Sequence, residues 1–224
     1  MTKRYIARMF PSTAAMYINF KRLAIGYGQW RTIRERRSVN ALGAPIPWYT
    51  YPAIEYLSSF DFSECDIFEY GAGNSSLFWA GRSRYVVSVE DSEDWVGHVN
   101  NMALPNQIII HRGTEDDYVS ALSEQGKSFH IVVIDGKWRR RCTDEAMRYL
   151  EDGGMIVLDN SDRTIELDCS KVLRDHGFLQ VDFSGFGPIN GYCWTTSVFI
   201  KARTTLQRNF SETAPSGGLS NLVG

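Results

Sequence analysis

Short apolar runs alternate with stretches of helical spacing from about residue 66 onward. Two of the runs, at residues 131–134 and 155–158, contain only apolar side chains, which is typical of strands covered on both faces of a sheet. Runs of this kind predict strands at residues 66–70, 85–90, 107–111, 130–135 and 155–159, with helices between them at 75–81, 94–102, 118–125 and 143–150. This alternation predicts an α/β fold with a parallel sheet and right-handed crossovers.

The pattern changes after the fifth predicted strand. A helix is expected at residues 165–176, followed by strands at 179–183 and 195–201. Only a stretch rich in Gly, Pro and Asn, at residues 185–191, joins these two strands. It is too short for a helical crossover, so the pair is expected to be antiparallel. Ser, Thr, Gly and Asn dominate from residue 203 onward, and a disordered tail is predicted there.

The first 50 residues differ from the rest. Residues 1–40 hold nine basic residues and one acid, with apolar residues at roughly helical spacing, and predict one or two amphipathic basic helices broken near Pro11. The basic face is either solvated or docks on an anionic membrane surface or an acidic partner. Three prolines and three large aromatics at 43–52 predict a stiff, extended loop, and a short helix is expected at 53–60. We therefore expect an extension (1–50), one large domain (51–202) and a tail (203–224).

Composition narrows the class of protein. The chain has 224 residues, 43% of them hydrophobic, and a net charge of −2, which is ordinary for a soluble folded protein and argues against a globally basic nucleic-acid binder. The near-neutral total averages the basic first 40 residues and a remainder with 15 basic and 25 acidic residues. Four scattered cysteines, no signal-peptide pattern and no apolar run of about 18 residues or more favour a cytoplasmic protein.

The strongest local motif lies at the end of the first predicted strand. Glu69 is followed by Gly71 and Gly73, which permit a tight turn and close approach of the backbone to a ligand at the carboxyl edge of the sheet. Ser76 stands where a dinucleotide-binding motif has its third glycine. The next strand ends at Glu90, 17 residues after Gly73, where a carboxylate can accept both ribose hydroxyls of a nucleoside. The alternatives are a plain strand-to-helix turn and a solvated acid at a helix start.

Glu69-x-Gly71-x-Gly73 followed by Glu90 resembles the first two motifs of class I S-adenosylmethionine-dependent methyltransferases, over roughly residues 51–201. The resemblance implies a doubly wound, Rossmann-like sheet of about seven strands, mostly parallel with a reversed last strand. It also implies S-adenosylmethionine as cofactor, with the methionyl part near the glycine turn and the ribose on the second-strand acid. The cofactor-binding residues that it implies are Glu69, Gly71, Gly73, Asn74, Glu90, Asp91, Thr114 and Glu115.

Polar residues also follow the fourth and fifth predicted strands. Asp135, Asp159 and Asn160 are hard oxygen ligands at neighbouring strand ends, and such ligands suit Mg²⁺. The arrangement is similar to that of catechol-type O-methyltransferases, which hold a metal with an Asp after strand four and an Asp-Asn pair after strand five. The alternative is that these side chains order the loops through hydrogen bonds.

Transfer of a methyl group to an alcohol or phenol requires a base. Asp135 is the first candidate and His111, at the end of the third strand, the second. Lys137 and Arg139 would make the rim of the cleft basic, which suits an acidic acceptor such as a uronic acid or phosphorylated sugar. The aromatic residues Trp48, Tyr49 and Tyr192 could stack on an acceptor ring. The alternative for the two basic residues is a solvated loop. The alternative for the aromatic residues is a seam between the N-terminal helices and the sheet.

These expectations favour O-methylation of a small molecule or saccharide. One rival is an NAD-dependent oxidoreductase, which is disfavoured by Ser76 and by the reversed final hairpin. The other is a non-catalytic methyltransferase-like domain that uses its basic arm to bind a partner.

Overall fold

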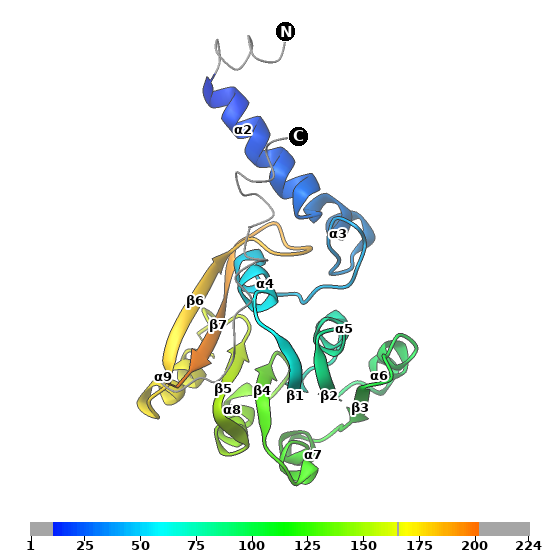
Figure 1. The fold of residues 1–224 in the computed structure, drawn as a ribbon, viewed down its shortest axis with the longest axis vertical. Coiled ribbons are helices and arrows are strands. Elements are labelled where there is room, and N and C mark those ends of the chain that lie inside the picture. The colour runs from blue at the N-terminus through cyan, green and yellow to red at the C-terminus, as the bar shows by residue number, and fades with distance from the viewer. Residues whose placement is uncertain (1–10, 165, 202–224) are drawn as a thin grey trace.

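The computed structural model describes residues 11–164 and 166–201, and the predicted tail from residue 203 lies outside them. Seven strands form one sheet in the order β3-β2-β1-β4-β5-β7-β6 (Figure 1). Strands β1 to β5 pair in parallel, whereas β7 is antiparallel to both β5 and β6. The predicted α/β sheet with its antiparallel final pair is confirmed. The strands are β1 (Phe62–Tyr70), β2 (Ser83–Glu90), β3 (Gln107–His111), β4 (Phe129–Ile134), β5 (Leu150–Leu158), β6 (Leu179–Gly185) and β7 (Trp194–Ile200).

Helices connect the parallel strands, as the apolar pattern predicts, but several bounds differ. Helix α7 starts at Glu115, three residues earlier than expected, because Thr114 caps it and the three residues Glu115 to Asp117 place negative charge in its first turn. The helices are α2 (Pro11–Lys21), a π-helical turn η1 (Arg22–Gly26), α3 (Gln29–Glu35), α4 (Tyr51–Ser58), α5 (Asn74–Ala80), α6 (Glu93–Asn100), α7 (Glu115–Ser120), a 3₁₀ turn η2 (Ser123–Gln125), α8 (Arg139–Arg148) and α9 (Leu167–Asp175).

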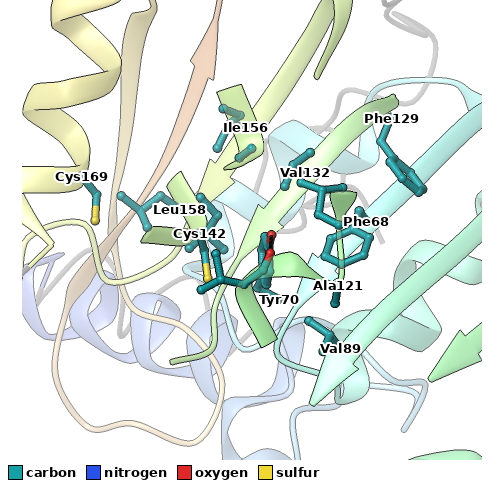
Figure 2. Close-up of a cluster of buried hydrophobic side chains, with 14 of the residues drawn as sticks. Phe68, Tyr70, Val89, Ala121, Phe129, Val132, Cys142, Ile156, Leu158 and Cys169 are labelled. Carbon is teal, nitrogen blue, oxygen red and sulfur yellow. Dashed lines mark hydrogen bonds between the residues drawn. The ribbon is translucent and has the colours of Figure 1, made fainter. Parts of the chain in front are cut away.

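The central strands are buried on both faces of the sheet. Successive strand side chains point to opposite faces, so Val132 and Ile134 of β4 join one apolar cluster while Ile131 and Val133 join the other. Helices α7, α8 and α9 cover the first cluster, part of which is shown in Figure 2, and α4 and α5 cover the second. The result is a three-layer fold in which the carboxyl ends of the parallel strands lie along one edge of the sheet.

The N-terminal segment is fixed to this edge through α3 and not through α2. Thr32 Oγ1 accepts a hydrogen bond from the Ile189 amide at 2.8 Å, and Gln29 Nε2 donates one to the Asn190 carbonyl at 3.1 Å. Both partners lie in the loop between β6 and β7. Helix α2, described over Pro11–Lys21, buries none of these residues and projects away from the sheet (Figure 1). Helix α2 therefore does not cover the sheet.

The predicted stiff loop at residues 43–52 has one strand-like contact, a single bridge between Val39 and Pro45, before α4 begins at Tyr51. In the part of the chain that the structure describes, no helix combines the length and apolarity needed to cross a bilayer.

Candidate functional site

A cavity of about 580 Å³ opens at the carboxyl ends of β1, β2, β4 and β5, within the size range of small-molecule sites. Most of its lining comes from three regions of the chain, the loop after α3, the ends of the parallel strands and the loops that follow them, and the β6–β7 loop, and helix α6 adds Trp95 and His98. The lining residues are Arg36, Arg37, Ser38, Trp48, Gly71, Ala72, Gly73, Asn74, Ser75, Glu90, Asp91, Trp95, His98, Asp135, Gly136, Lys137, Arg139, Asp159, Asn160, Arg163, Ile189, Asn190, Tyr192 and Trp194.

The two glycines of the turn after β1 are used differently. Gly71 has φ +96°, and a Cβ there would lie 2.8 Å from the Asp135 carbonyl oxygen, so no larger residue fits without strain. A Cβ on Gly73 would meet nothing within 4 Å. Gly71 therefore lets the ends of β1 and β4 approach, whereas Gly73 leaves its backbone open to the cavity.

Glu69 lies beneath the turn and does not line the cavity. Its side chain is fully buried and accepts hydrogen bonds from Ser76 Oγ and, at 2.8 Å, from Ser88 Oγ. Burial raises the pKa of this carboxyl to about 7, although the serine hydrogen bonds oppose the shift. Glu69 is expected from the sequence to contact a cofactor directly, but in this structure it supports the turn from inside and does not reach the cavity surface.

Glu90 lies at the cavity wall, as expected, and is fixed by backbone amides. Its Oε2 accepts from the Ala72 amide at 3.1 Å and its Oε1 from the Ser92 amide at 3.1 Å. Burial raises its pKa above the ordinary value, and these hydrogen bonds oppose the shift. The indole of Trp95 donates to the Ala72 carbonyl at 2.7 Å and stacks on His98 with ring centroids 4.9 Å apart. Sequence reasoning missed these two aromatic residues, although they follow Glu90 closely on α6.

Asp91 and Lys137, predicted for different subsites, form an ion pair at the cavity. The Lys137 side chain is largely exposed, and its pairing raises the pKa of the ammonium group. The cofactor side and the acceptor side of the predicted site are therefore joined by this contact.

Besides Glu69 and the aromatic residue Tyr49, three further predicted site residues do not line the cavity: Thr114, Glu115 and His111. Thr114 caps α7 by accepting from the Asp117 amide, and Glu115 pairs with Arg141 at 3.1 Å. His111 ends the edge strand β3 with its Nε2 3.2 Å from the Asp91 carbonyl oxygen. These positions do not fit the predicted cofactor contacts or the role of His111 as a base.

Two carboxyl groups follow β4 and β5, the partly exposed Asp135 and the buried Asp159. Asp159 Oδ1 accepts from Thr196 Oγ1 at 2.5 Å and from Trp194 Nε1 at 3.1 Å. Asp135 keeps about a fifth of its side chain exposed, and its Oδ1 lies 3.2 Å from an Arg139 guanidinium nitrogen. Burial raises the pKa of both carboxyls, and the charge of Asp135 raises that of Asp159 further. Asp159 is thus held by hydrogen bonds, whereas Asp135 reaches the cavity.

These residues do not fit a divalent cation. No cluster of three or more His, Cys, Asp or Glu side chains suited to a metal ion occurs among residues 11–164 and 166–201. The Arg139 guanidinium occupies one side of Asp135, and Asp159 already accepts two protein hydrogen bonds. The predicted Mg²⁺ site at Asp135, Asp159 and Asn160 is therefore not supported. For Asp159 the structure favours the alternative, ordering of the loop through hydrogen bonds.

The basic side chains at the rim differ from those predicted. All four of the cations at 137–141 have carboxylate partners: Lys137–Asp91, Arg139–Asp135, Arg140–Asp144 and Arg141–Glu115. Arg36, Arg37 and Arg163 also line the cavity, and none of the carboxylates that the structure describes lies within ion-pair distance of them. The cations available to a ligand are therefore ones that sequence reasoning missed.

The three predicted aromatic contacts separate into two groups. Trp48 and Tyr192 line the cavity with exposed rings. Tyr49 is fully buried and accepts a hydrogen bond from Trp79 Nε1 at 3.5 Å. Tyr49 therefore belongs to the seam between the N-terminal segment and the sheet, and it is not placed to stack on an acceptor.

Backbone strain also concentrates here. Four residues other than glycine have positive φ among those described: Arg36, Trp138, Asn160 and Ile189. Three of them line the cavity, and Trp138 lies between two lining residues. Each such conformation costs about 1–3 kcal/mol, and residues of this kind cluster at ligand sites. Ile189 is the most unusual, because β-branched residues rarely adopt positive φ.

No protein-family profile and no curated protein matches the sequence. Among solved structures, the chain is similar to an rRNA methylase from Streptococcus thermophilus, with 18% identity, a TM-score of 0.51 and coverage of 68% of this chain and 97% of that one. It is also similar to a precorrin-6y C5,15-methyltransferase from Geobacter metallireducens, with 14% identity, a TM-score of 0.52 and coverage of 67% and 87%. The fold is therefore the Rossmann-like fold of methyltransferases.

Proposed function

We propose that the protein is an S-adenosylmethionine-dependent methyltransferase that methylates an oxygen of a small, anionic acceptor such as an acidic saccharide. The observation that carries the proposal is the close approach of the Gly71 backbone to that of Asp135. Both residues line the cavity together with Glu90. The sheet order reverses between β1 and β4, and ligands of open α/β sheets bind outside the strand ends at such a reversal.

The residues on the β1–β2 side fit the parts of the donor. The open backbone at Gly73 admits the methionyl chain, and the fixed Glu90 carboxylate has lone pairs left for ribose hydroxyls. Trp95 and His98 add an aromatic wall suited to a purine ring. When bound, S-adenosylmethionine supplies a methyl group already activated by its sulfonium.

The residues on the β4–β5 side fit the two other tasks of the protein, which are to orient the acceptor and to remove its proton. Holding an acceptor oxygen in line with the methyl group contributes about 7–11 kcal/mol through orientation alone. Asp135 reaches the cavity, and its raised pKa suits a group that takes the acceptor's proton near neutral pH. Arg139 lies 3.2 Å from Asp135 and holds its carboxylate in place.

The acceptor class follows from the lining of the cavity. Arg36, Arg37 and Arg163 present cations that no described carboxylate approaches within ion-pair distance, which suits a carboxylate or phosphate group, although the charge of Arg163 lowers the pKa of Asp135. Trp48 and Tyr192 provide faces on which a sugar or aromatic ring can stack. A cavity of about 580 Å³ must hold donor and acceptor together, which favours a small acceptor over a polymer.

Calorimetric titration tests the donor. We expect the wild type to bind S-adenosylmethionine and S-adenosylhomocysteine, and Glu90→Ala to weaken both by about tenfold or more through loss of hydrogen bonds to a charged acceptor group. Glu93→Ala, an exposed acid at the start of α6, is the matched control and should bind normally. Binding of NAD⁺ without either sulfur nucleoside would contradict the proposal and support the oxidoreductase alternative.

Transfer of a labelled methyl group tests the acceptor. Glucuronate and glucose 6-phosphate should be better acceptors than glucose, and Arg37→Gln or Arg163→Gln should raise KM for the anionic ones while leaving S-adenosylhomocysteine affinity unchanged. A chelator should not alter the rate. Equal use of charged and neutral acceptors would reject the anionic class while leaving the donor assignment intact.

A further inference from the structure

Exposed apolar side chains concentrate in one segment, residues 11–48, which we call the N-terminal arm. Nine of the sixteen large hydrophobic residues that are exposed in the described chain lie in this segment. It makes up only about a fifth of the described residues, so the concentration is well above chance. The nine are Met16, Tyr17, Ile18, Phe20, Ile25, Trp30, Ile33, Leu42 and Trp48.

Helix α2 displays the outermost of these side chains. Met16 is 73% exposed and Phe20, one turn further along the same face, is 62% exposed. The exposure is not that of a detached segment, because Leu23 packs against the core and the ring of Tyr27 contacts that of Tyr51, with centroids 4.6 Å apart. An apolar cluster held out from a folded domain in this way marks an interaction surface.

The charge of the arm selects the partner. Residues 11–48 contain six basic residues and one acid, Glu35, which pairs with Arg31 and Arg34. Lys21 and Arg22 have no carboxylate within ion-pair distance among the described residues. A second copy packed through the same arm would bring two basic segments together, and the one acid in each, Glu35, is already paired within its own arm. An anionic lipid surface neutralises the cations and covers the apolar side chains at once.

We propose that the N-terminal arm docks the protein on the surface of an anionic lipid bilayer. Met16, Tyr17 and Phe20 enter the interface between headgroups and acyl chains, and Lys21 and Arg22 bind headgroup phosphates. The arm lies on the membrane and does not cross it, because no helix among the described residues is long and apolar enough to span a bilayer. The proposal is independent of the methyltransferase assignment.

Co-sedimentation of the full chain with vesicles tests the proposal. Binding to vesicles of phosphatidylcholine with a quarter phosphatidylglycerol should exceed binding to pure phosphatidylcholine by about tenfold or more, and 0.5 M NaCl should remove most of the difference. Met16→Ser/Phe20→Ser and Lys21→Gln/Arg22→Gln should each weaken binding by roughly tenfold. Met16, Phe20 and Lys21 are exposed and Arg22 is half-buried at the surface, so circular dichroism should show unchanged folding.

Matched variants elsewhere on the surface provide the control. Ile108→Ser/Leu179→Ser removes exposed apolar side chains from β3 and β6, and Arg148→Gln/Lys171→Gln removes exposed cations from α8 and α9. Both should bind vesicles as the wild type does. Equal binding to anionic and neutral vesicles would overturn the proposal. Arm variants that bind as the wild type does would also overturn it. An oligomer in light scattering that Met16→Ser/Phe20→Ser converts to a monomer would overturn it in favour of a second copy.

Discussion

The hydroxyl of Ser76 accepts a hydrogen bond from the Gly73 amide at 2.9 Å and donates one to the buried carboxylate of Glu69. The residue at the position of the third glycine in a dinucleotide motif therefore connects a buried acid to the floor of the cavity. A glycine there would leave both groups without this partner.

Ser76→Ala should weaken both the turn and the fold. The Gly73 amide loses its acceptor, and Glu69 loses one of its donors, so we expect the free energy of unfolding to fall by about 1–3 kcal/mol and S-adenosylhomocysteine affinity to fall by about tenfold. Chemical denaturation and calorimetry measure the two effects. Ser123→Ala, in the 3₁₀ turn η2, should change neither, and unaltered binding by Ser76→Ala would separate this contact from the site.

Glu69 should make stability depend on pH in a defined direction. Its folded pKa of about 7 lies above its ordinary value of 4.5, so the folded state holds the proton more tightly than the unfolded state does. The stability that this group contributes is complete below pH 4.5 and is lost as the pH rises through 7. At 1.36 kcal/mol for each pKa unit, the loss is about 3 kcal/mol. Urea denaturation of wild type and Glu69→Gln at pH 4.5, 6 and 8 should show the gap between them changing by about this amount. A difference in free energy of unfolding between the two proteins that stays the same at all three pH values would contradict this prediction.

The two glycines of the turn allow stability to be separated from binding. Gly71→Ala places a Cβ 2.8 Å from the Asp135 carbonyl oxygen at φ +96°, so it should lower the melting temperature, with a cost of at least about 1 kcal/mol. Gly73→Ala meets nothing within 4 Å, so the melting temperature should stay the same while S-adenosylhomocysteine affinity falls. Thermal scans with and without S-adenosylhomocysteine distinguish the two variants. Equal melting temperatures, or full binding by Gly73→Ala, would contradict this division.

The fold could be predicted from the sequence because its central strands are buried on both faces, which leaves runs such as residues 131–134 without a polar side chain. Gly71 and Glu90 could be placed because strand ends meet at one edge of a parallel sheet. Arg37 could not, since it reaches the cavity only through contacts such as that of Thr32 with Ile189, 157 residues later in the chain. The pairing of the basic residues at the rim with carboxylates also could not be predicted from the sequence, because Lys137 pairs with an acid 46 residues earlier in the chain.

Asp135→Asn should remove catalysis and leave cofactor binding. If Asp135 takes the acceptor's proton, kcat with an accepted anionic sugar should fall by about 10²–10⁴, with S-adenosylhomocysteine affinity within about threefold of wild type. Burial raises the pKa of this carboxyl, so the wild-type rate should fall as the pH drops through a value above that of an ordinary aspartate. The variant should lack this limb. An unchanged pH profile of kcat in the variant would exclude Asp135 as the base.

Thr32→Val should loosen the wall of the cavity from a distance. Thr32 is fully buried, and its hydroxyl accepts from the amide of Ile189, which lines the cavity with positive φ. Valine keeps the shape but leaves this amide unpaired, so we expect a loss of about 1–3 kcal/mol in the free energy of unfolding. Because the β6–β7 loop borders the acceptor side, KM for the acceptor should rise while S-adenosylhomocysteine affinity stays the same. Thr13→Val, on the exposed face of α2, is the matched control. A parallel loss of donor affinity would show that the loop shapes the whole cavity and not the acceptor side alone.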